Sequence, residues 1–209
     1  MMQLQFISHQ TERYTYLDGI RLALDGGIRW IQLRMKEAST EEILRTGAET
    51  RKLCDSYDAV FIIDDHAELV HELGADGVHL GKNDMPIADA RQLLGQDVII
   101  GGTANTFEDI RHHHDATANY IGCGPYRFTT TKKNLSPTLG IDGYRCLMQQ
   151  ARDAGINTPV IAIGGITAHD IPAIIRTGIA GIALSSAILR AEHPQTEIRN
   201  IIHTINATQ

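Results

Sequence analysis

The sequence predicts an α/β protein in which residues 1–209 form one domain, a closed barrel of eight parallel strands with helices around it. Eight short apolar runs recur along the chain, as expected for strands that are buried on both faces. Segments with helical character separate the runs, and repeated strand–helix units give a parallel sheet. A doubly wound open sheet is the alternative, but residues 7–10 lack its glycine-rich fingerprint. The length of 209 residues is near the lower end for a (β/α)8 barrel, or TIM barrel.

The expected strands are runs of three or four mainly apolar residues, and most follow a cluster of Gly, Ala or Asp. Helix signals lie between them. Ser39 or Thr40, followed by Glu residues, predicts an N-cap for a helix over residues 40–56, and Pro86 suits the first position of another helix. The expected strands are residues 4–7, 30–33, 60–63, 77–80, 98–100, 120–122, 160–163 and 181–184. Further helices are expected at residues 106–115, 142–153, 167–176 and about 196–205.

The composition excludes several classes of partner. A net charge of −6 gives no field that attracts polyanions, and 5% aromatic residues are too few for stacking on nucleic-acid bases. No run approaches the ~18 apolar residues that a membrane span needs. Residues 1–9 lack the pattern of a signal peptide. Cys54, Cys123 and Cys146 show no metal-ligand spacing, which favours reduced thiols and a cytoplasmic location.

The reacting groups of such a barrel lie at the carboxyl ends of its strands. After the second run, strand alternation places Gln32, Arg34 and Lys36 on one side. Two cations and an amide that face one way suit a diphosphate and a polar ring, so Arg34 and Lys36 are candidate catalytic residues. The alternative is an ordinary solvated strand end, which the position of the set at the catalytic rim makes the less favoured interpretation.

Carboxylates follow the third and fourth runs. Asp64 and Asp65 end the third, and Asp84 comes shortly after the fourth. Carboxylates on adjacent strand ends can converge on one cation, and Mg²⁺ prefers one or two carboxylates with phosphate oxygens and water. Alternatively, Asp64 or Asp65 is the N-cap of a helix that begins near His66. Beside the basic set, the carboxylates favour a Mg²⁺ site.

Hydroxyls and glycines follow the last three runs. Residues 124–133 form a long polar loop over the mouth of the barrel, and loops of this length usually have a role. Gly-Gly at 164–165 and Ser-Ser at 185–186 lie where this fold commonly binds phosphate. The rim therefore offers a basic, metal-assisted site for a diphosphate and a second site for a monophosphate. The candidate residues from these loops are Thr129, Thr130, Thr131, Lys132, Gly165, Ser185 and Ser186.

Several histidines and one cysteine are expected to have structural rather than catalytic roles. The histidines at 112–114 fan around a helix, so a solvated face is expected. His79 lies within a strand and is interpreted as a satisfied barrel histidine. Cys123 is expected to serve packing among small residues.

Several motifs resemble a known family. Gln-Leu-Arg-x-Lys stands at residues 32–36, and Asp-Gly-Val-His-Leu-Gly at 76–81 is followed by Asp84. Gly-x-Gly-Pro at 122–125 precedes Thr-x-Thr-Lys at 129–132, and Ala-Ile-Gly-Gly-Ile ends at Ile166. In this order and spacing the motifs resemble the thiamine phosphate synthase family over nearly the whole chain.

The resemblance implies a transferase that joins hydroxymethylpyrimidine diphosphate to hydroxyethylthiazole phosphate and releases pyrophosphate. It implies a dissociative displacement, in which pyrophosphate leaves and the thiazole nitrogen attacks a pyrimidine carbocation. It implies Mg²⁺ as cofactor on Asp65 and Asp84, and a catalytic role for Lys132 with Arg34 and Lys36. The implied pyrimidine diphosphate contacts are Gln32, Arg34, Lys36, Thr103 and Lys132, and the implied thiazole phosphate contacts are Thr129, Thr131, Gly165, Ser185 and Ser186. Leu33, Met35, Asp64 and Thr130 complete the expected substrate-binding set.

The chain departs from the family pattern at a few positions. Asp64 stands where Asn is usual, so it either contacts the pyrimidine diphosphate or joins the metal. Thr103 replaces a frequent Ser, and Arg127-Phe128 replaces an apolar residue and Pro before the threonines. The alternatives are a thiazole tautomerase-like barrel, a phosphosugar isomerase or epimerase, and a non-catalytic barrel that binds thiazole phosphate. The expected partners are the two small-molecule substrates, with a homo-oligomer left open.

Overall fold

The computed structural model describes residues 3–128 and 137–208, which form a closed barrel of eight parallel strands. The strands are β1 (Leu4–Ile7), β2 (Trp30–Leu33), β3 (Val60–Asp64), β4 (Gly77–Leu80), β5 (Ile99–Ala104), β6 (Tyr120–Cys123), β7 (Val160–Ile163) and β8 (Gly181–Leu184). The α-helices are α1 (Tyr16–Asp25), α2 (Thr40–Ser56), α3 (Val70–Leu73), α4 (Ile87–Leu94), α5 (Phe107–Asp115), α6 (Gly140–Asp153), α7 (Ile171–Ile175), α8 (Ser186–Leu189) and α9 (Pro194–Thr208). Two 3₁₀ helices are η1 (Ala67–Leu69) and η2 (Ala168–Asp170).

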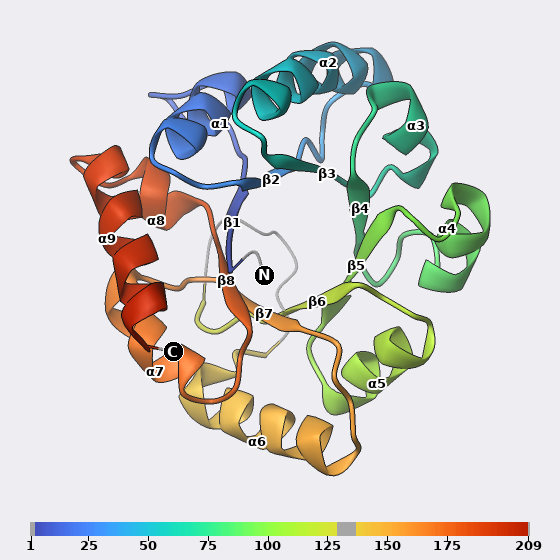
Figure 1. Cartoon of the computed structure of the whole chain (residues 1–209), viewed down its shortest axis with the longest axis vertical. Coiled ribbons are helices and arrows are strands. Elements are labelled where there is room, and N and C mark those ends of the chain that lie inside the picture. Colours follow the sequence, from blue (N-terminus) through green and yellow to red (C-terminus); the bar gives the residue numbers. More distant parts are fainter. Residues whose placement is uncertain (1–2, 129–136, 209) are drawn as a thin grey trace.

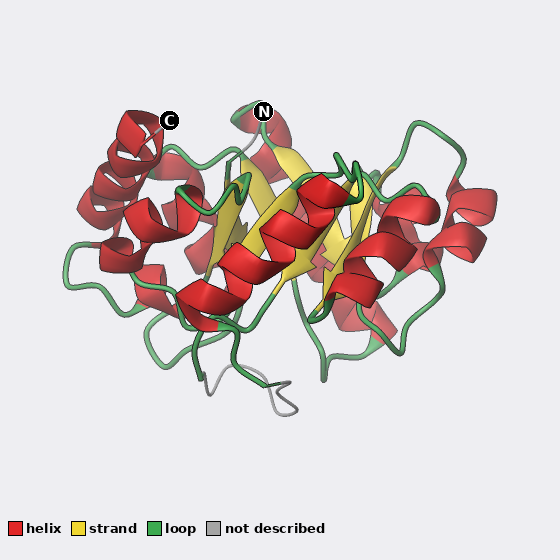
Figure 2. Cartoon of the chain, turned by 90° about the horizontal axis from the view of Figure 1, so that it is seen from below, coloured by secondary structure: helices red, strands yellow, loops and turns green. Residues whose placement is uncertain are grey.

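Each strand pairs with the next strand along the chain, and β8 pairs with β1, so the barrel has no free edge. Figure 1 shows the helices as a ring around the strands, and Figure 2 shows the same arrangement from the side. The (β/α)8 fold expected from the sequence is therefore confirmed.

The expected strands match the observed ones closely, and β5 shows the main difference. The expected strand at residues 98–100 is observed as Ile99–Ala104. Gly101 and Gly102 end the apolar run, but the backbone keeps pairing with β6 as far as Ala104 opposite Cys123. Pairing rather than hydrophobicity extends this strand, and it carries Thr103 to the rim.

Helix boundaries follow local capping chemistry. Ser39 and Glu42 form a reciprocal capping box, and α2 occupies the residues expected for it. The helix expected at residues 167–176 is divided into η2 and α7. Pro172 has no amide hydrogen to bond the carbonyl of Ala168, so the first turn is a 3₁₀ turn.

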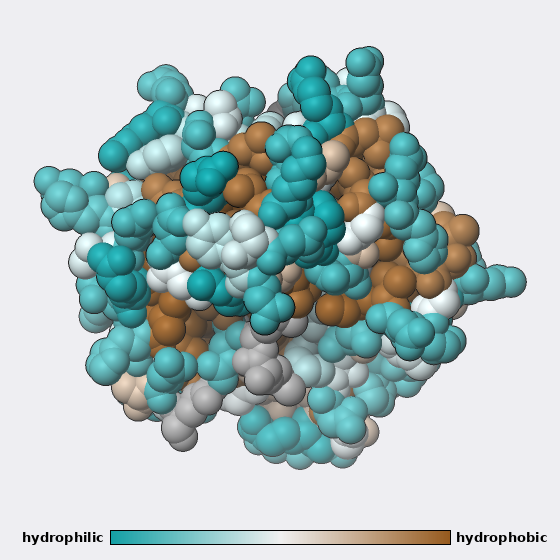
Figure 3. Space-filling model, turned by 45° about the horizontal axis from the view of Figure 1, so that its top comes forward, coloured by the Kyte–Doolittle hydropathy of each residue, from teal (hydrophilic) through white to brown (hydrophobic). Residues whose placement is uncertain are grey.

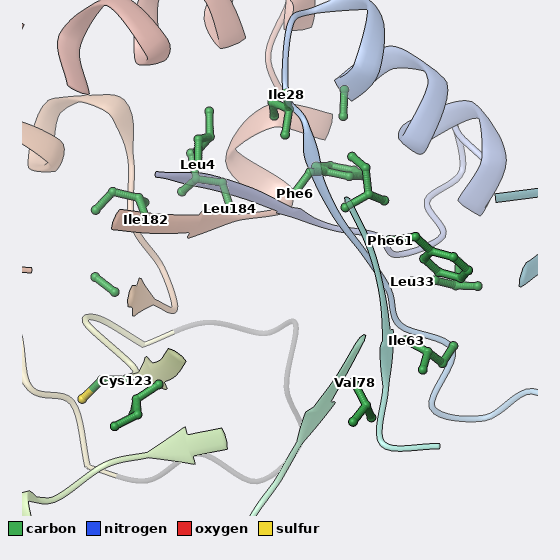
Figure 4. Packing of buried hydrophobic residues seen from close by; sticks show 14 of the residues in the cluster. Leu4, Phe6, Ile28, Leu33, Phe61, Ile63, Val78, Cys123, Ile182 and Leu184 are labelled. Atoms are coloured by element: carbon green, nitrogen blue, oxygen red, sulfur yellow. The ribbon is translucent and has the colours of Figure 1, made fainter. Parts of the chain in front are cut away.

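Two apolar layers form the core. The larger layer lies between the strands and the helices, where Figure 4 shows residues such as Phe6, Phe61 and Ile63. The smaller layer contains Trp30 and Tyr120 and fills the barrel interior. Neighbouring residues of one strand alternate between the two layers, because side chains of a strand point to opposite faces.

Tyr120 fits the interior because the neighbouring strand β5 has a glycine, Gly101, beside it. A Cβ atom added at Gly101 would lie 2.2 Å from the Tyr120 ring, which is far inside contact distance. The ring also packs edge-on against Trp30, with 4.8 Å between ring centroids. This aromatic pair is the bulkiest part of the apolar layer that fills the interior below the rim.

Hydrophilic residues cover much of the face shown in Figure 3, with apolar residues between them. Among the residues that the structure describes, no helix is both long enough and apolar enough to cross a membrane.

Tyr144 on α6 makes a buried hydrogen bond that should contribute measurably to stability. Its hydroxyl donates to the carbonyl of Cys123 at 2.8 Å and lies 3.3 Å from the amide of Ile163. Tyr144→Phe leaves that carbonyl without its donor, so we expect the free energy of unfolding to fall by about 1–2 kcal/mol in urea titration. An unchanged urea midpoint would show that the bond contributes nothing.

Candidate active site

A pocket of about 810 Å³, counted to its open mouth, lies at the carboxyl ends of the strands. Residues from β1 to β5, β7 and β8, and from the segments after them, line it. The predicted basic, acidic and hydroxyl groups therefore share one cavity. The predicted residues that line it are Gln32, Arg34, Lys36, Asp64, Asp65, Thr103, Gly165, Ser185 and Ser186.

Carboxylates at the end of β3 hold the two cations that follow β2. The Nε atom of Arg34 lies 3.3 Å from Asp64 Oδ2, and the Nζ atom of Lys36 lies 3.5 Å from the same oxygen. Lys36 also forms an ion pair with Asp65. Burial opposes the charge on Lys36, but the carboxylates of Asp64 and Asp65 outweigh it and raise the pKa of the lysine. Lys36 is therefore an ammonium at neutral pH.

The first pair of aspartates does not cap the following helix. η1 begins after His66 and has no side-chain cap bond. Asp64 is the last residue of β3, and Asp65 has a φ of 67°, which is uncommon for a residue other than glycine. This backbone turn holds both carboxyl groups at the pocket, so the capping alternative is wrong.

Asp65 and Asp84 bring two carboxyl groups together from adjacent strand ends. Asp84 accepts a hydrogen bond from the amide of Gly81 at 2.7 Å, and the two carboxyl groups are bonded to each other. Burial and the Asp84 carboxyl raise the pKa of Asp65. Burial opposes ionisation of Asp84, but the bonds from Asp65 and Gly81 prevail and lower its pKa. Two carboxyl groups this close together favour a proton or a metal cation held between them.

The donor set fits a divalent cation that takes other ligands from a substrate. Among residues 3–128 and 137–208, Oδ1 of Asp65 is buried and has no hydrogen-bond donor. No group of three or more His, Cys, Asp or Glu side chains that could hold a metal occurs in that part of the chain. Mg²⁺ suits such a pair, because it commonly uses one or two carboxylates and keeps phosphate and water ligands.

The opposite edge of the pocket presents hydroxyls and a close backbone. Gly165 has a φ of 68°, and a Cβ there would lie 2.8 Å from the carbonyl of Arg127, so only glycine fits without strain. Ser185 Oγ lies 2.7 Å from Nδ1 of His9. Burial, and then the charges of Arg190 and Arg34, lower the pKa of His9, so a neutral imidazole partners Ser185.

The sequence analysis did not propose two polar residues that line the pocket, Ser8 and His79, or His9, which contacts the lining residue Ser185. Ser8 accepts a hydrogen bond from the amide of Arg34 at 3.1 Å and so fixes the start of the basic segment. His9 was not singled out, because a histidine after β1 carries no motif. His79 bonds both Tyr120 and Thr103, so its interpretation as a satisfied barrel histidine is correct, yet it also lines the pocket.

Some predicted contacts lie elsewhere. Leu33 and Met35 are buried in the outer apolar layer, because alternation points them away from Gln32 and Arg34, so contact of their side chains with a substrate is not supported. His113 is also not on a solvated face: its Nε2 lies 2.9 Å from the carbonyl of Thr103. Thr129, Thr130, Thr131 and Lys132 lie outside the described residues.

Fold and site together define a barrel enzyme with a charged pocket at the catalytic end of its strands. The model of the thiamine monophosphate synthase family matches residues 4–188. A thiamine-phosphate synthase from Bacteroides fragilis is 59% identical over 203 residues, which are 97% of this chain and 100% of that protein. A second, from Flavobacterium johnsoniae, is 45% identical over 95% of this chain and 94% of that protein. The chain belongs to the thiamine monophosphate synthase family.

Solved structures agree with this family and with the fold. A thiamine phosphate pyrophosphorylase from Pyrococcus furiosus superposes with a TM-score of 0.86 at 30% identity, over 99% of this chain and 96% of that one. A 3-hexulose-6-phosphate synthase from Salmonella typhimurium superposes with a TM-score of 0.71 at 17% identity, which shows a shared fold alone. The family expected from the sequence motifs is therefore confirmed.

Arg127 clamps the segment after β6 to the segment after β7. Its two terminal nitrogens donate to the two oxygens of Asp170 at 2.8 and 2.9 Å, and one also donates to the carbonyl of Gly165 at 2.9 Å. The hydrogen bonds from Arg127 are the main reason why the pKa of Asp170 is lowered to about 2. This clamp holds Gly165 at the edge of the pocket.

The clamp should give a stability that depends on pH. Because the folded pKa of Asp170 is depressed, its contribution is present above its usual pKa of 3.8 and is lost as the pH falls toward about 2. We expect Asp170→Asn to lower the free energy of unfolding at neutral pH by about 1 kcal/mol, allowing for the half-exposed Arg127. Urea unfolding across this pH range should show the difference from wild type narrowing below about pH 4.

The matched control is Asp142→Asn, because the Asp142–Arg145 pair lies exposed on α6. We expect no resolvable effect from that variant at any pH. A difference between wild type and Asp170→Asn that stays constant with pH would contradict the clamp.

Proposed function

We propose that this pocket joins a pyrimidine diphosphate to a thiazole phosphate and releases pyrophosphate. The thiamine-phosphate synthase activity follows from membership of the family, and the enzyme is a transferase of thiamine biosynthesis. One observation carries the assignment of residues: two groups share a single cavity. One group is the cation–carboxylate cluster of Arg34, Lys36, Asp64 and Asp65, and the other is the glycine–serine edge of Gly165, Ser185 and Ser186.

The diphosphate is proposed to lie against Arg34 and Lys36. Both are charged, and both are anchored by Asp64, which is buried beneath them. Asp64 is therefore proposed to position the cations rather than to bind the metal. Gln32 and Thr103 line the same pocket and offer polar contacts, and Lys132, which follows β6 in the sequence, is proposed as a further cation.

Mg²⁺ is the proposed cofactor, held by Asp65 and Asp84. The bonded carboxyl pair and the buried oxygen of Asp65 support this donor set. When bound, the ion supplies positive charge that stabilises the departing pyrophosphate.

The thiazole phosphate is proposed to lie at the opposite edge. The N–H of Gly165 and the hydroxyls of Ser185 and Ser186 suit a phosphate, and the two serines stand where this fold commonly binds one. His9 orients the first of these hydroxyls. Thr129, Thr130 and Thr131, which follow β6 in the sequence, are proposed to complete this site.

The proposed step is a displacement at the methylene carbon of the pyrimidine. The bond from carbon to the diphosphate oxygen breaks first, the leaving oxygen keeps the electron pair, and the thiazole nitrogen then forms the carbon–nitrogen bond. That nitrogen carries no proton, so no general base is required. Stabilising the charge of the leaving group is the main demand, and Arg34, Lys36 and Lys132 are suited to it.

The alternative functions do not require the cations and carboxylates of this pocket. A tautomerase-like or non-catalytic thiazole phosphate barrel needs the glycine–serine edge but has no use for the diphosphate cations and the carboxyl pair. Action in the cytoplasm is proposed, and the unpaired thiols of Cys54, Cys123 and Cys146 favour it.

The decisive assay supplies the protein with both substrates and Mg²⁺. We expect thiamine phosphate and pyrophosphate in equal amounts, and no product when either substrate is omitted. Folded protein that binds thiazole phosphate but forms no product would instead support the non-catalytic or tautomerase-like alternatives.

Asp84→Ala tests the metal site. We expect activity to fall by about a hundredfold or more while circular dichroism and the melting temperature stay close to wild type, because the change removes a metal ligand. Asp89→Ala, an exposed carboxylate on α4, is the control and should keep full activity. Wild-type rates for Asp84→Ala would show that the cation does not bind there.

A further inference from the structure

A buried chain of hydrogen bonds crosses the barrel interior below the pocket. Nε2 of Gln5 on β1 donates to the hydroxyl of Tyr120 on β6 at 3.4 Å. That hydroxyl lies 3.1 Å from Nδ1 of His79 on β4, and Nε2 of His79 lies 2.9 Å from Oγ1 of Thr103 on β5. The chain therefore runs from the middle of the barrel up to a residue that lines the pocket.

The donors at one end set the direction of every bond in the chain. The Tyr120 oxygen accepts a hydrogen bond from the side-chain amide of Gln5, and the side-chain amide of Gln32 also favours that oxygen as an acceptor. Its own hydrogen is then directed to Nδ1 of His79, which must accept. A neutral histidine that accepts at Nδ1 carries its proton at Nε2, so His79 donates to Thr103.

The same direction fixes what Thr103 can offer to a ligand. Its oxygen accepts from His79, so its hydroxyl hydrogen is free to point into the pocket as a donor. A diphosphate or a ring nitrogen accepts such a hydrogen bond, whereas a ligand that itself donates is disfavoured.

Packing keeps the chain in place. Gln5, Tyr120 and His79 are each less than a tenth exposed. Burial is also the main cause that raises the pKa of Tyr120, so its hydroxyl keeps its hydrogen at every physiological pH. A Cβ at Gly122 would lie 2.9 Å from the His79 ring, so this ring packs closely against the backbone of β6. Hydrogen bonds in such surroundings are strong and hard to replace.

We propose that Tyr120 is a positioning residue for the pyrimidine diphosphate: it holds His79 in the Nε2–H form and so makes the Thr103 hydroxyl a donor to that substrate. The inference rests on the proposed placement of the pyrimidine diphosphate beside Thr103. Tyr120 itself lies below the pocket and acts through two other side chains.

A spectroscopic test determines the tautomer of His79 in the wild-type protein and uses no variant of Tyr120. The ¹⁵N shifts of His79, assigned by comparison with His79→Gln, should show a protonated Nε2 and an unprotonated Nδ1 at neutral pH. The opposite tautomer, or a doubly protonated ring, would overturn the inference even if every variant of Tyr120 failed to fold.

A double-mutant cycle tests how Tyr120 acts. We expect Tyr120→Phe and Thr103→Val each to raise KM for the pyrimidine diphosphate about five- to tenfold, with KM for the thiazole phosphate within about twofold of wild type. Because Tyr120 acts through Thr103, Tyr120→Phe should have little further effect in the Thr103→Val background. Thr103→Ser keeps the hydroxyl and should restore KM.

Tyr144→Phe is the matched control, because it removes another buried tyrosine hydroxyl and lies outside the chain of bonds. It should leave KM for the pyrimidine diphosphate unchanged. Additive effects of Tyr120→Phe and Thr103→Val would overturn the positioning role while leaving the proposed substrate placement intact. An unchanged KM in Thr103→Val, in a protein that still makes thiamine phosphate, would overturn both the placement and the inference but leave the activity standing.

Discussion

The closed ladder of eight parallel strands is the constraint on which the rest of the molecule depends. Closure forces the side chains of each strand to alternate between the barrel interior and the layer beneath the helices. In β2 the same rule places Trp30 and Gln32 inside and Ile31 and Leu33 outside. Because all the strands run in one direction, their inward polar residues meet at a single rim. The position of the pocket therefore follows from the strand topology and not from any single residue.

Sequence reasoning predicted the features that follow from repetition. Apolar runs and capping boxes are local, so the strands and a helix such as α2 could be located from residue order alone. Strand parity likewise grouped Gln32, Arg34 and Lys36, and the structure places all three at the pocket. Leu33 was expected in the site because it belongs to the family motif. Strand alternation instead points its side chain toward the helices.

What the sequence could not predict depends on contacts between distant segments. The continuation of β5 through two glycines comes from pairing with β6, and hydrophobicity carries no sign of it. His113 reaches the carbonyl of Thr103 from a helix that looked solvated. The partners of Tyr120 come from three other strands, so no spacing within one motif could have revealed them.

The hydrogen bond between His9 and Ser185 joins the segments that follow β1 and β8, which lie 176 positions apart in the sequence. Contacts of such long range carry a larger loop-closure cost than contacts between neighbouring strands. The cation–carboxylate cluster, by contrast, needs only β2 to β4 and the turns after them. During folding, the half of the pocket with the charges can therefore assemble while the barrel is still an open sheet. The contact between His9 and Ser185 can form only once β8 has paired with β1, so this edge of the pocket depends on closure of the barrel.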